Sequence, residues 1–207
     1  MIHFDPPQEP ATFDADCRQP GLLHLQQGGD YWRDFWSEFR PDLAEGFNWL
    51  CGYSGVRLAK GTVDHYRAKG SKPSKSPNRP ELAYDWSNYR FADSEINNGK
   101  RSERPGDPLV LDPFEVQDGW FEIAIPSLRL KITNKLPAIL EDRAKFTLDK
   151  LKLRDGSAIM RLRQDLYSSY VTGHVSISHV RQQMPLLAKA LVIHVPPEIG
   201  EFRIKKL

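Results

Sequence analysis

A strand pattern in the middle of the chain ends in two chemically reactive side chains. The turn signal Lys60-Gly61 is followed by Thr62-Val63, so that Asp64-His65 falls at the end of a predicted strand. Because side chains alternate along a strand, Asp64 and His65 should at first point to opposite faces. They can serve one reaction if the backbone leaves regular β geometry at His65, or if Asp64 reaches a metal ion lying under the strand end. The residues alone leave both arrangements open.

A second strand and a helix are predicted directly afterwards. Residues 88 to 92 can pair as the next strand, and Asp93 or Ser94 can cap the helix that follows. On that helix Asn97 and Lys100 are three positions apart and therefore lie on one face. The expected order is strand, strand, helix, although Asn97-Asn98-Gly99 taken alone would indicate only a turn.

These side chains are the types that hydrolysis of a phosphodiester bond requires. A neutral histidine is a competent base because its ordinary pKa is about 6.5, and a positioned general base contributes roughly 10² to 10⁴ in rate. Mg²⁺ or Mn²⁺ prefers oxygen ligands and keeps several waters, so one carboxylate and one amide oxygen are enough when substrate phosphate completes the coordination sphere. We therefore expect His65 to be the general base and Asp64 and Asn97 to be the metal ligands.

The ordered set Val63-Asp64-His65, Asn88 and Asn97-x-x-Lys100 resembles the HNH, or ββα-metal, nucleases, over residues 51 to 113. The resemblance implies a β-hairpin followed by a helix. It also implies that His65 is the base, that Asp64 and Asn97 bind the metal, that Asn88 fixes the loop and the base, and that Lys100 contacts phosphate. Asn88 can equally be read as a residue that caps a loop.

The flanking sequence is similar to a narrower branch, the HNH proteins of bacterial anti-phage defence systems of the Septu and retron-associated types. Those systems pair the nuclease with an ABC-type ATPase, which would be the partner here. Many HNH proteins hold this core with zinc through two Cys-x-x-Cys pairs, but here the positions read Cys51, Ser54, Asp93 and Ile96. A structural zinc site needs four ligands, so we predict none. The similarity rests on four segments: 50–54, 64–69, 82–90 and 109–114.

One segment is strongly basic. Residues 67 to 80 contain five positive charges, three prolines and no acidic residue. Such a segment is most often a solvated insertion, yet beside a phosphate-cleaving site it could contribute a salt-dependent grip on backbone phosphates. The predicted nucleic-acid contacts in this loop are Arg67, Lys69, Lys72 and Lys75.

Composition bounds the remaining possibilities. With 207 residues, 27% charged and 40% hydrophobic, the chain has the composition of an ordinary globular protein, and its net charge of +2 does not reveal a nucleic-acid partner. Two cysteines far apart in sequence argue against a disulfide scaffold. The chain start has no signal-peptide pattern, and no stretch approaches a membrane-spanning length. We expect a protein of the bacterial cytoplasm that has no membrane contact.

The expected fold is α+β, with a small ββα core and flanking helices. Residues 1–50 would contain an extended arm to residue 29, an aromatic-rich helix after Asp30, a break at Pro41 and a helix from about 42 to 50. Residues 51–113 would be the HNH core. Residues 114–207 would hold strands near 120–125 and 128–132, then helices near 137–152, 156–171 and 177–192. The aromatic residues after Asp30 are expected to pack in the core, with base stacking as the alternative.

The leading hypothesis is a Mg²⁺-dependent, sequence-tolerant HNH endonuclease that acts on DNA and is licensed by a partner ATPase or another sensor. A double-strand break needs two sites, so a homodimer or a larger complex is plausible. A non-catalytic subunit that binds nucleic acid or a partner on the same scaffold is one alternative. An RNA-cutting toxin is another, because a metal ion and a general base do not by themselves distinguish ribose from deoxyribose.

Overall fold

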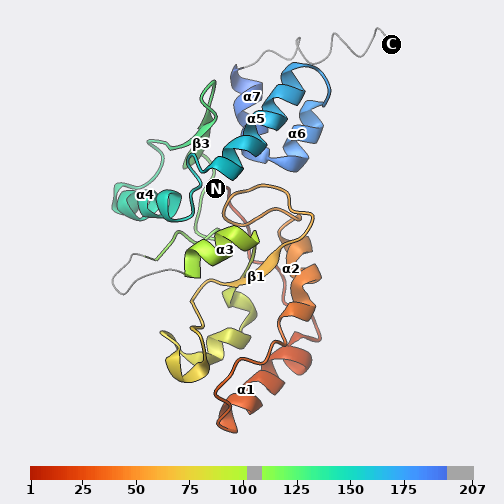
Figure 1. The fold of residues 1–207 in the computed structure, drawn as a ribbon, viewed down its shortest axis with the longest axis vertical. Coiled ribbons are helices and arrows are strands. Elements are labelled where there is room, and N and C mark those ends of the chain that lie inside the picture. The colour runs from red at the N-terminus through yellow and green to blue at the C-terminus, as the bar shows by residue number, and fades with distance from the viewer. Residues whose placement is uncertain (102–108, 195–207) are drawn as a thin grey trace. The chain divides into compact units, whose positions relative to one another are not determined.

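The computed structural model describes residues 1–101 and 109–194, and it has the predicted α+β composition (Figure 1). The chain forms two compact units. One, the β1–β2 unit, consists of residues 4–52 and 58–101. The other, the β3–β4 unit, consists of residues 1–3, 53–57 and 102–207, of which residues 102–108 and 195–207 lie outside the described parts. Each unit contains one two-stranded antiparallel sheet.

The predicted strand, strand and helix form in the β1–β2 unit. Strand β1 (Thr62–His65) pairs antiparallel with β2 (Tyr89–Ala92), and His65 lies opposite Tyr89 in the register. Helix α3 (Ser94–Arg101) begins as expected after Asp93, whose Oδ1 accepts hydrogen bonds from the backbone N–H groups of Glu95 at 2.9 Å and of Ile96 at 3.3 Å. That cap satisfies two amide groups that a helix start otherwise leaves without a partner.

The first 29 residues do not form the extended arm that we expected. Asp14–Arg18 is a π-helical turn and leads into helix α1 (Gln19–Gln26). Phe13 and Cys17 are completely buried, and Gly21 lies so close to the ring of Tyr84 that a Cβ there would be 2.3 Å from the ring. The arm was predicted from its polar composition, but a few apolar residues and one glycine are enough to pack this segment against the rest of the unit.

The predicted aromatic helix after Asp30 is also absent. The chain is irregular up to a 3₁₀ turn at Ser37–Phe39, and helix α2 (Arg40–Gly46) then carries Pro41 in its first turn, as proline allows. The predicted helix 42–50 therefore starts and ends earlier. Tertiary partners explain the irregular stretch, because the Asp30 carboxylate binds Lys72 instead of capping a helix and the Trp32 Nε1–H group donates to the Gly70 carbonyl at 3.0 Å.

The segment between β1 and β2 is long and contains only short 3₁₀ turns, at Pro73–Lys75, Pro80–Tyr84 and Trp86–Asn88. Its first part is the basic segment, residues 67–80. Its later part contains Tyr84, whose ring lies near those of Phe35 and Trp36.

The β3–β4 unit follows the predicted pattern more closely. Strands β3 (Phe121–Ala124) and β4 (Arg129–Ile132) form a hairpin, and the helices are α4 (Glu141–Lys150), α5 (Ser157–Val171), α6 (Ile177–Gln183) and α7 (Pro185–His194), with a 3₁₀ turn at Ala138–Leu140 before α4. The single helix predicted for 177–192 is two helices, because Pro185 excludes the helical conformation for the residue before it and Met184 has φ −157°. Within residues 1–101 and 109–194, no helix is both long and apolar enough to cross a membrane.

Candidate functional site

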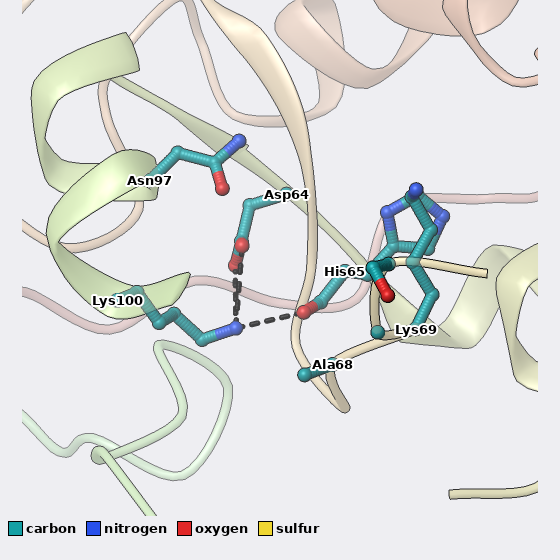
Figure 2. Close-up of a pocket in the computed structure, with 8 residues that line it drawn as sticks. Asp64, His65, Ala68, Lys69, Asn97 and Lys100 are labelled. Atoms are coloured by element: carbon teal, nitrogen blue, oxygen red, sulfur yellow. Dashed lines mark hydrogen bonds and ion pairs between the residues drawn. The ribbon is translucent and has the colours of Figure 1, made fainter. Parts of the chain in front are cut away.

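A cavity of about 410 Å³ opens beside the end of β1, within the β1–β2 unit (Figure 2). Strand β1, the loop that follows it and helix α3 supply its walls. Eight residues line it: Asp64, His65, Ala68, Lys69, Gly70, Ser71, Asn97 and Lys100. Four of the predicted site residues (Asp64, His65, Asn97 and Lys100) and one lysine of the basic loop therefore meet in one place.

Asp64 and Lys100 form a buried ion pair on this wall. The Lys100 ammonium lies 3.2 Å from each carboxylate oxygen of Asp64, and both side chains are about 3% exposed. The same ammonium donates to the backbone carbonyl oxygens of His65 at 2.7 Å and Tyr66 at 2.9 Å. An ammonium has three N–H donors, so these contacts engage all of them. Lys100 holds Asp64 and the end of β1 together, and it can contact a phosphate only by giving up one of these bonds.

Asn97 turns its amide oxygen towards Asp64 (Figure 2). Its Nδ2 group sets this orientation, because it donates to Thr62 Oγ1 at 3.0 Å and to the Val63 carbonyl oxygen at 3.4 Å. One carboxylate and one amide oxygen thus face the same space. Both are hard oxygen donors of the kind that Mg²⁺ and Mn²⁺ prefer, with water and substrate phosphate as the remaining ligands. The donor chemistry therefore fits the predicted ion, although within the described residues no group of three or more His, Cys, Asp and Glu side chains converges on one point.

His65 is fixed by a hydrogen bond and by two aromatic rings. Its Nε2 lies 3.1 Å from the backbone carbonyl oxygen of Ala83. A carbonyl oxygen only accepts, so Nε2 carries the proton and the neutral ring has its lone pair on Nδ1. The Trp36 ring meets the imidazole edge-on, with centroids 4.7 Å apart, and the Tyr89 ring lies at 5.2 Å. One hydrogen bond and two aromatic contacts therefore fix the orientation of the ring.

Asp64 and His65 lie on opposite sides of β1, as strand alternation requires, and yet both reach the cavity (Figure 2). His65 is the last residue of β1, where the sheet ends. Asp64 points towards α3, and its partners Asn97 and Lys100 come from that helix. His65 is still within the strand, so the first of the two arrangements, in which the backbone leaves β geometry at His65, is not the one observed. The second, in which Asp64 reaches a metal ion, stays a prediction.

Asn88 does not line the cavity but ties together the two loops that shape it. Its Oδ1 accepts from the Arg67 backbone N–H at 2.7 Å, and its Nδ2 donates to the carbonyl oxygens of Arg67 at 3.1 Å and Leu82 at 2.8 Å. Leu82 immediately precedes Ala83, the hydrogen-bond partner of His65. Through these bonds Asn88 connects the loop after β1 with the segment that carries the Ala83 carbonyl.

The predicted basic contacts are not equivalent. Lys69 lines the cavity, whereas Lys72 forms an exposed ion pair with Asp30, and Arg67 and Lys75 are exposed residues outside the lining. Although the segment has no acid of its own, Asp30 comes to it from elsewhere in the chain.

Sequence reasoning missed two groups that shape the site. One is the Ala83 carbonyl, which no side-chain motif can reveal. The other is Trp36, which is 7% exposed and which helical spacing assigned to a core helix. It is buried as expected, but against the imidazole. A tryptophan that is separated from the motif by helix α2 and the turns after it gives no local signal of this contact.

Other titratable groups lie behind His65. The Tyr89 hydroxyl donates to the same Ala83 carbonyl at 2.7 Å, and the Cys17 sulfur lies 3.7 Å from that hydroxyl. Burial raises the pKa of Tyr89 well above its usual range and raises the pKa of the Cys17 thiol to about 11. Both groups are therefore neutral at physiological pH, and they add no charge near His65.

Comparison with known proteins gives no assignment: no family model, no curated protein and no solved structure matches this chain. Any function must therefore be argued from the site itself.

Proposed function

We propose that the protein is a metal-dependent endonuclease that hydrolyses phosphodiester bonds of DNA with an HNH-type ββα core. The observation that supports this proposal best is that Asp64, His65 and Asn97, from β1 and α3, line one cavity. A strand pair followed by a helix is also the order of elements that the resemblance implies.

In the proposed reaction, His65 accepts a proton on Nδ1 from the attacking water. The Nε2–H bond to the Ala83 carbonyl keeps the lone pair on Nδ1 and becomes stronger as the ring gains charge. Asp64 and Asn97 present the two oxygens that would hold Mg²⁺ or Mn²⁺, which supplies charge stabilisation at the phosphate and the leaving oxygen. Asn88 keeps the loops, and through them the base, in place.

The ion pair between Asp64 and Lys100 supports a second candidate, a non-catalytic subunit that binds a partner or nucleic acid. The Lys100 ammonium pairs with Asp64, so this carboxylate already has a partner of opposite charge. Under the enzyme proposal, a divalent ion must share Asp64 with Lys100 or displace it. The two candidates therefore differ in whether Asp64 binds Mg²⁺.

The deciding experiment is cleavage of supercoiled plasmid by purified protein with Mg²⁺ or Mn²⁺, in which wild type is compared with His65→Ala and EDTA is the metal-free control. The enzyme proposal predicts nicking or linearisation that EDTA abolishes and that His65→Ala lowers by roughly 10²-fold or more. If plasmid stays intact, calorimetric titration of Mg²⁺ into wild type and Asp64→Ala decides between the candidates. Equal heats for both proteins would favour the scaffold. An RNA-cutting activity is tested in the same assay with a labelled RNA as substrate.

The wider role that we propose, as effector of a bacterial anti-phage system with an ABC-type ATPase partner and a homodimeric or larger assembly, rests on the sequence resemblance alone. Its test is co-purification of the chain with such an ATPase encoded beside it.

A further inference from the structure

Besides Lys100, a second lysine faces the cavity, and two tryptophan rings hold it there. The Lys69 ammonium lies 5.1 Å from the ring centroid of Trp32 and 5.1 Å from that of Trp36. Both distances are within the range of cation–π attraction, which favours the charged form of the side chain. Lys69 is half-buried and is one of the residues that line the cavity.

The backbone around Lys69 is also fixed. Gly70 has φ +75°, in the left-handed region that favours glycine, and a Cβ there would lie 2.5 Å from the Lys75 carbonyl oxygen. The Gly70 carbonyl in turn accepts the Trp32 Nε1–H bond at 3.0 Å. Trp32 therefore contacts both the side chain of Lys69 and the turn that follows it.

The two lysines have different surroundings. Lys100 is 3% exposed, and its three N–H donors bind Asp64 and two backbone carbonyl oxygens. Lys69 is placed on the wall of the cavity by ring faces, on the same side as the base. An anion that enters the cavity can meet the charge of Lys69 without breaking the Asp64–Lys100 pair.

Trp36 connects this lysine with the general base. The same indole that attracts the Lys69 ammonium meets the His65 imidazole edge-on at 89°. The spacing between the base and the cation is thus set by one buried side chain, and a general base must lie at a set distance from the phosphate that is attacked.

We infer that Lys69 binds the phosphate of the substrate in this cavity, and that Trp32 and Trp36 position it there. The inference rests on the proposed function for its substrate class, a nucleic-acid phosphodiester, and it assigns the phosphate contact to Lys69 in place of Lys100.

The test is binding of a short fluorescein-labelled DNA duplex, measured by anisotropy in EDTA at several salt concentrations so that no turnover occurs. Lys69→Met should weaken binding about tenfold and reduce the salt slope by about 1, as expected for the loss of one phosphate contact. Lys69→Arg should bind like wild type, because a guanidinium keeps the charge and stacks well on indole. Lys60→Met is the matched control, at an exposed lysine of the same unit that does not line the cavity, and it should change affinity less than about twofold. Trp32→Leu tests the positioning role and should fall between wild type and Lys69→Met.

Wild-type affinity and salt slope in Lys69→Met would overturn the inference, and so would equal losses in Lys69→Met and Lys60→Met. The absence of DNA binding by wild type would also overturn it. Unchanged affinity in Trp32→Leu would overturn the positioning role. Binding that depends on Lys69 in a protein that never cuts plasmid would support the inference while the nuclease proposal fails. Metal-dependent cutting with unchanged affinity in Lys69→Met would leave the nuclease proposal standing without the inference. Circular dichroism of each variant verifies that it is folded.

Discussion

The two hairpins of this protein are equal in size and differ in what surrounds them. Each pairs two strands of four residues in antiparallel register. In β1–β2, seven of the eight residues are buried, whereas in β3–β4 only three are. The second hairpin alternates, with Phe121 and Ile123 inward and Glu122 outward. The first buries its polar side chains along with its apolar ones.

The difference shows where folding and chemistry compete. In β3–β4, one face is exposed to solvent, and water hydrates its charged side chains. In β1–β2, Asp64, His65 and Arg90 are buried, and a buried polar group is stable only when it has a partner. The partners come from α3 and from the loop before β2. The hairpin with the least solvent contact is thus the one that depends most on side chains distant in sequence.

The largest expected effect is the loss of Asp64. Asp64→Ala leaves the buried Lys100 ammonium without its carboxylate, and breaking a buried pair in this way lowers the free energy of unfolding by about 3 to 5 kcal/mol. Under the proposed function, it also removes metal-dependent cleavage. Glu122→Ala, at an exposed position of β3, should change stability by no more than about 0.5 kcal/mol. Urea denaturation of both variants measures the contrast, which would be wrong if the two shifts were equal.

A double variant separates folding from chemistry at this position. Asp64→Leu with Lys100→Met replaces the ion pair by apolar groups, which is often neutral or stabilising for a buried pair. Stability should return only part of the way to the wild-type value, because the His65 and Tyr66 carbonyl oxygens lose the Lys100 donor, and cleavage should remain absent. Recovery of cleavage in the double variant would show that Asp64 is not needed for the metal.

Asn88 provides the next effect. Asn88→Ala removes three hydrogen bonds between the loops on either side of the hairpin and should destabilise the protein by about 2 to 3 kcal/mol. Asn88→Asp keeps the acceptor for the Arg67 N–H group but sets a buried carboxylate oxygen against the Arg67 and Leu82 carbonyl oxygens, so its destabilisation should be at least as large. The control is Ser127→Ala in the turn of β3–β4, where an exposed hydroxyl donates one bond at 3.2 Å and removal should change stability within about 0.5 kcal/mol. Thermal unfolding ranks the three variants, and the ranking fails if Asn88→Ala melts like Ser127→Ala.

Alkaline pH should weaken the β1–β2 unit. Burial raises the pKa of Cys17 from 9.0 to about 11, and burial also raises the pKa values of Tyr84 and Tyr89. The unfolded chain therefore releases these protons at lower pH than the folded chain does. Stability from these groups is complete below pH 9 and is lost as pH rises through the folded pKa values.

Tryptophan fluorescence can follow this loss, because Trp32, Trp36, Trp49 and Trp86 lie in the β1–β2 unit and Trp120 is the remaining one of the five. Urea midpoints that fall between pH 9 and 11 in wild type, and fall less in Cys17→Ala, would agree with the expectation. Midpoints that stay constant over that range would contradict it.

Much of the fold was readable from the sequence where local pattern and environment agree. The strands of both hairpins were predicted, and Asp93 was one of the two predicted caps, because alternation and capping act within a few residues. The helix expected after Asp30 failed because its aromatic residues find partners far along the chain. Trp32 binds Gly70 and Trp36 packs on His65, and such contacts override a helical spacing that local propensity supports only weakly.

The motif identified residues that lie together in the structure, but it did not reveal the contacts among them. The motif named Asp64, His65, Asn97 and Lys100, and the structure places all four on one cavity. The motif did not reveal that Lys100 binds Asp64 or that Lys69 stands between two indole rings. Those contacts depend on where a long loop and a distant segment meet, which no spacing within the motif encodes.

The smallest expected effect comes from an exposed charge near the same loop. The Lys72 ammonium lowers the pKa of Asp30 to about 2, so this carboxylate is charged throughout the neutral range. Asp30→Asn should leave the melting temperature almost unchanged, because exposed ion pairs contribute little, and it should raise affinity for DNA by less than about threefold as Lys72 loses its counter-charge. If Asp30→Asn instead lowered the affinity for DNA as much as Lys69→Met does, the Asp30–Lys72 pair would act by fixing the conformation of the loop. Asp30 also accepts the Ser74 backbone N–H at 3.2 Å, so it would then be holding the loop, and with it Lys69, in place over the cavity.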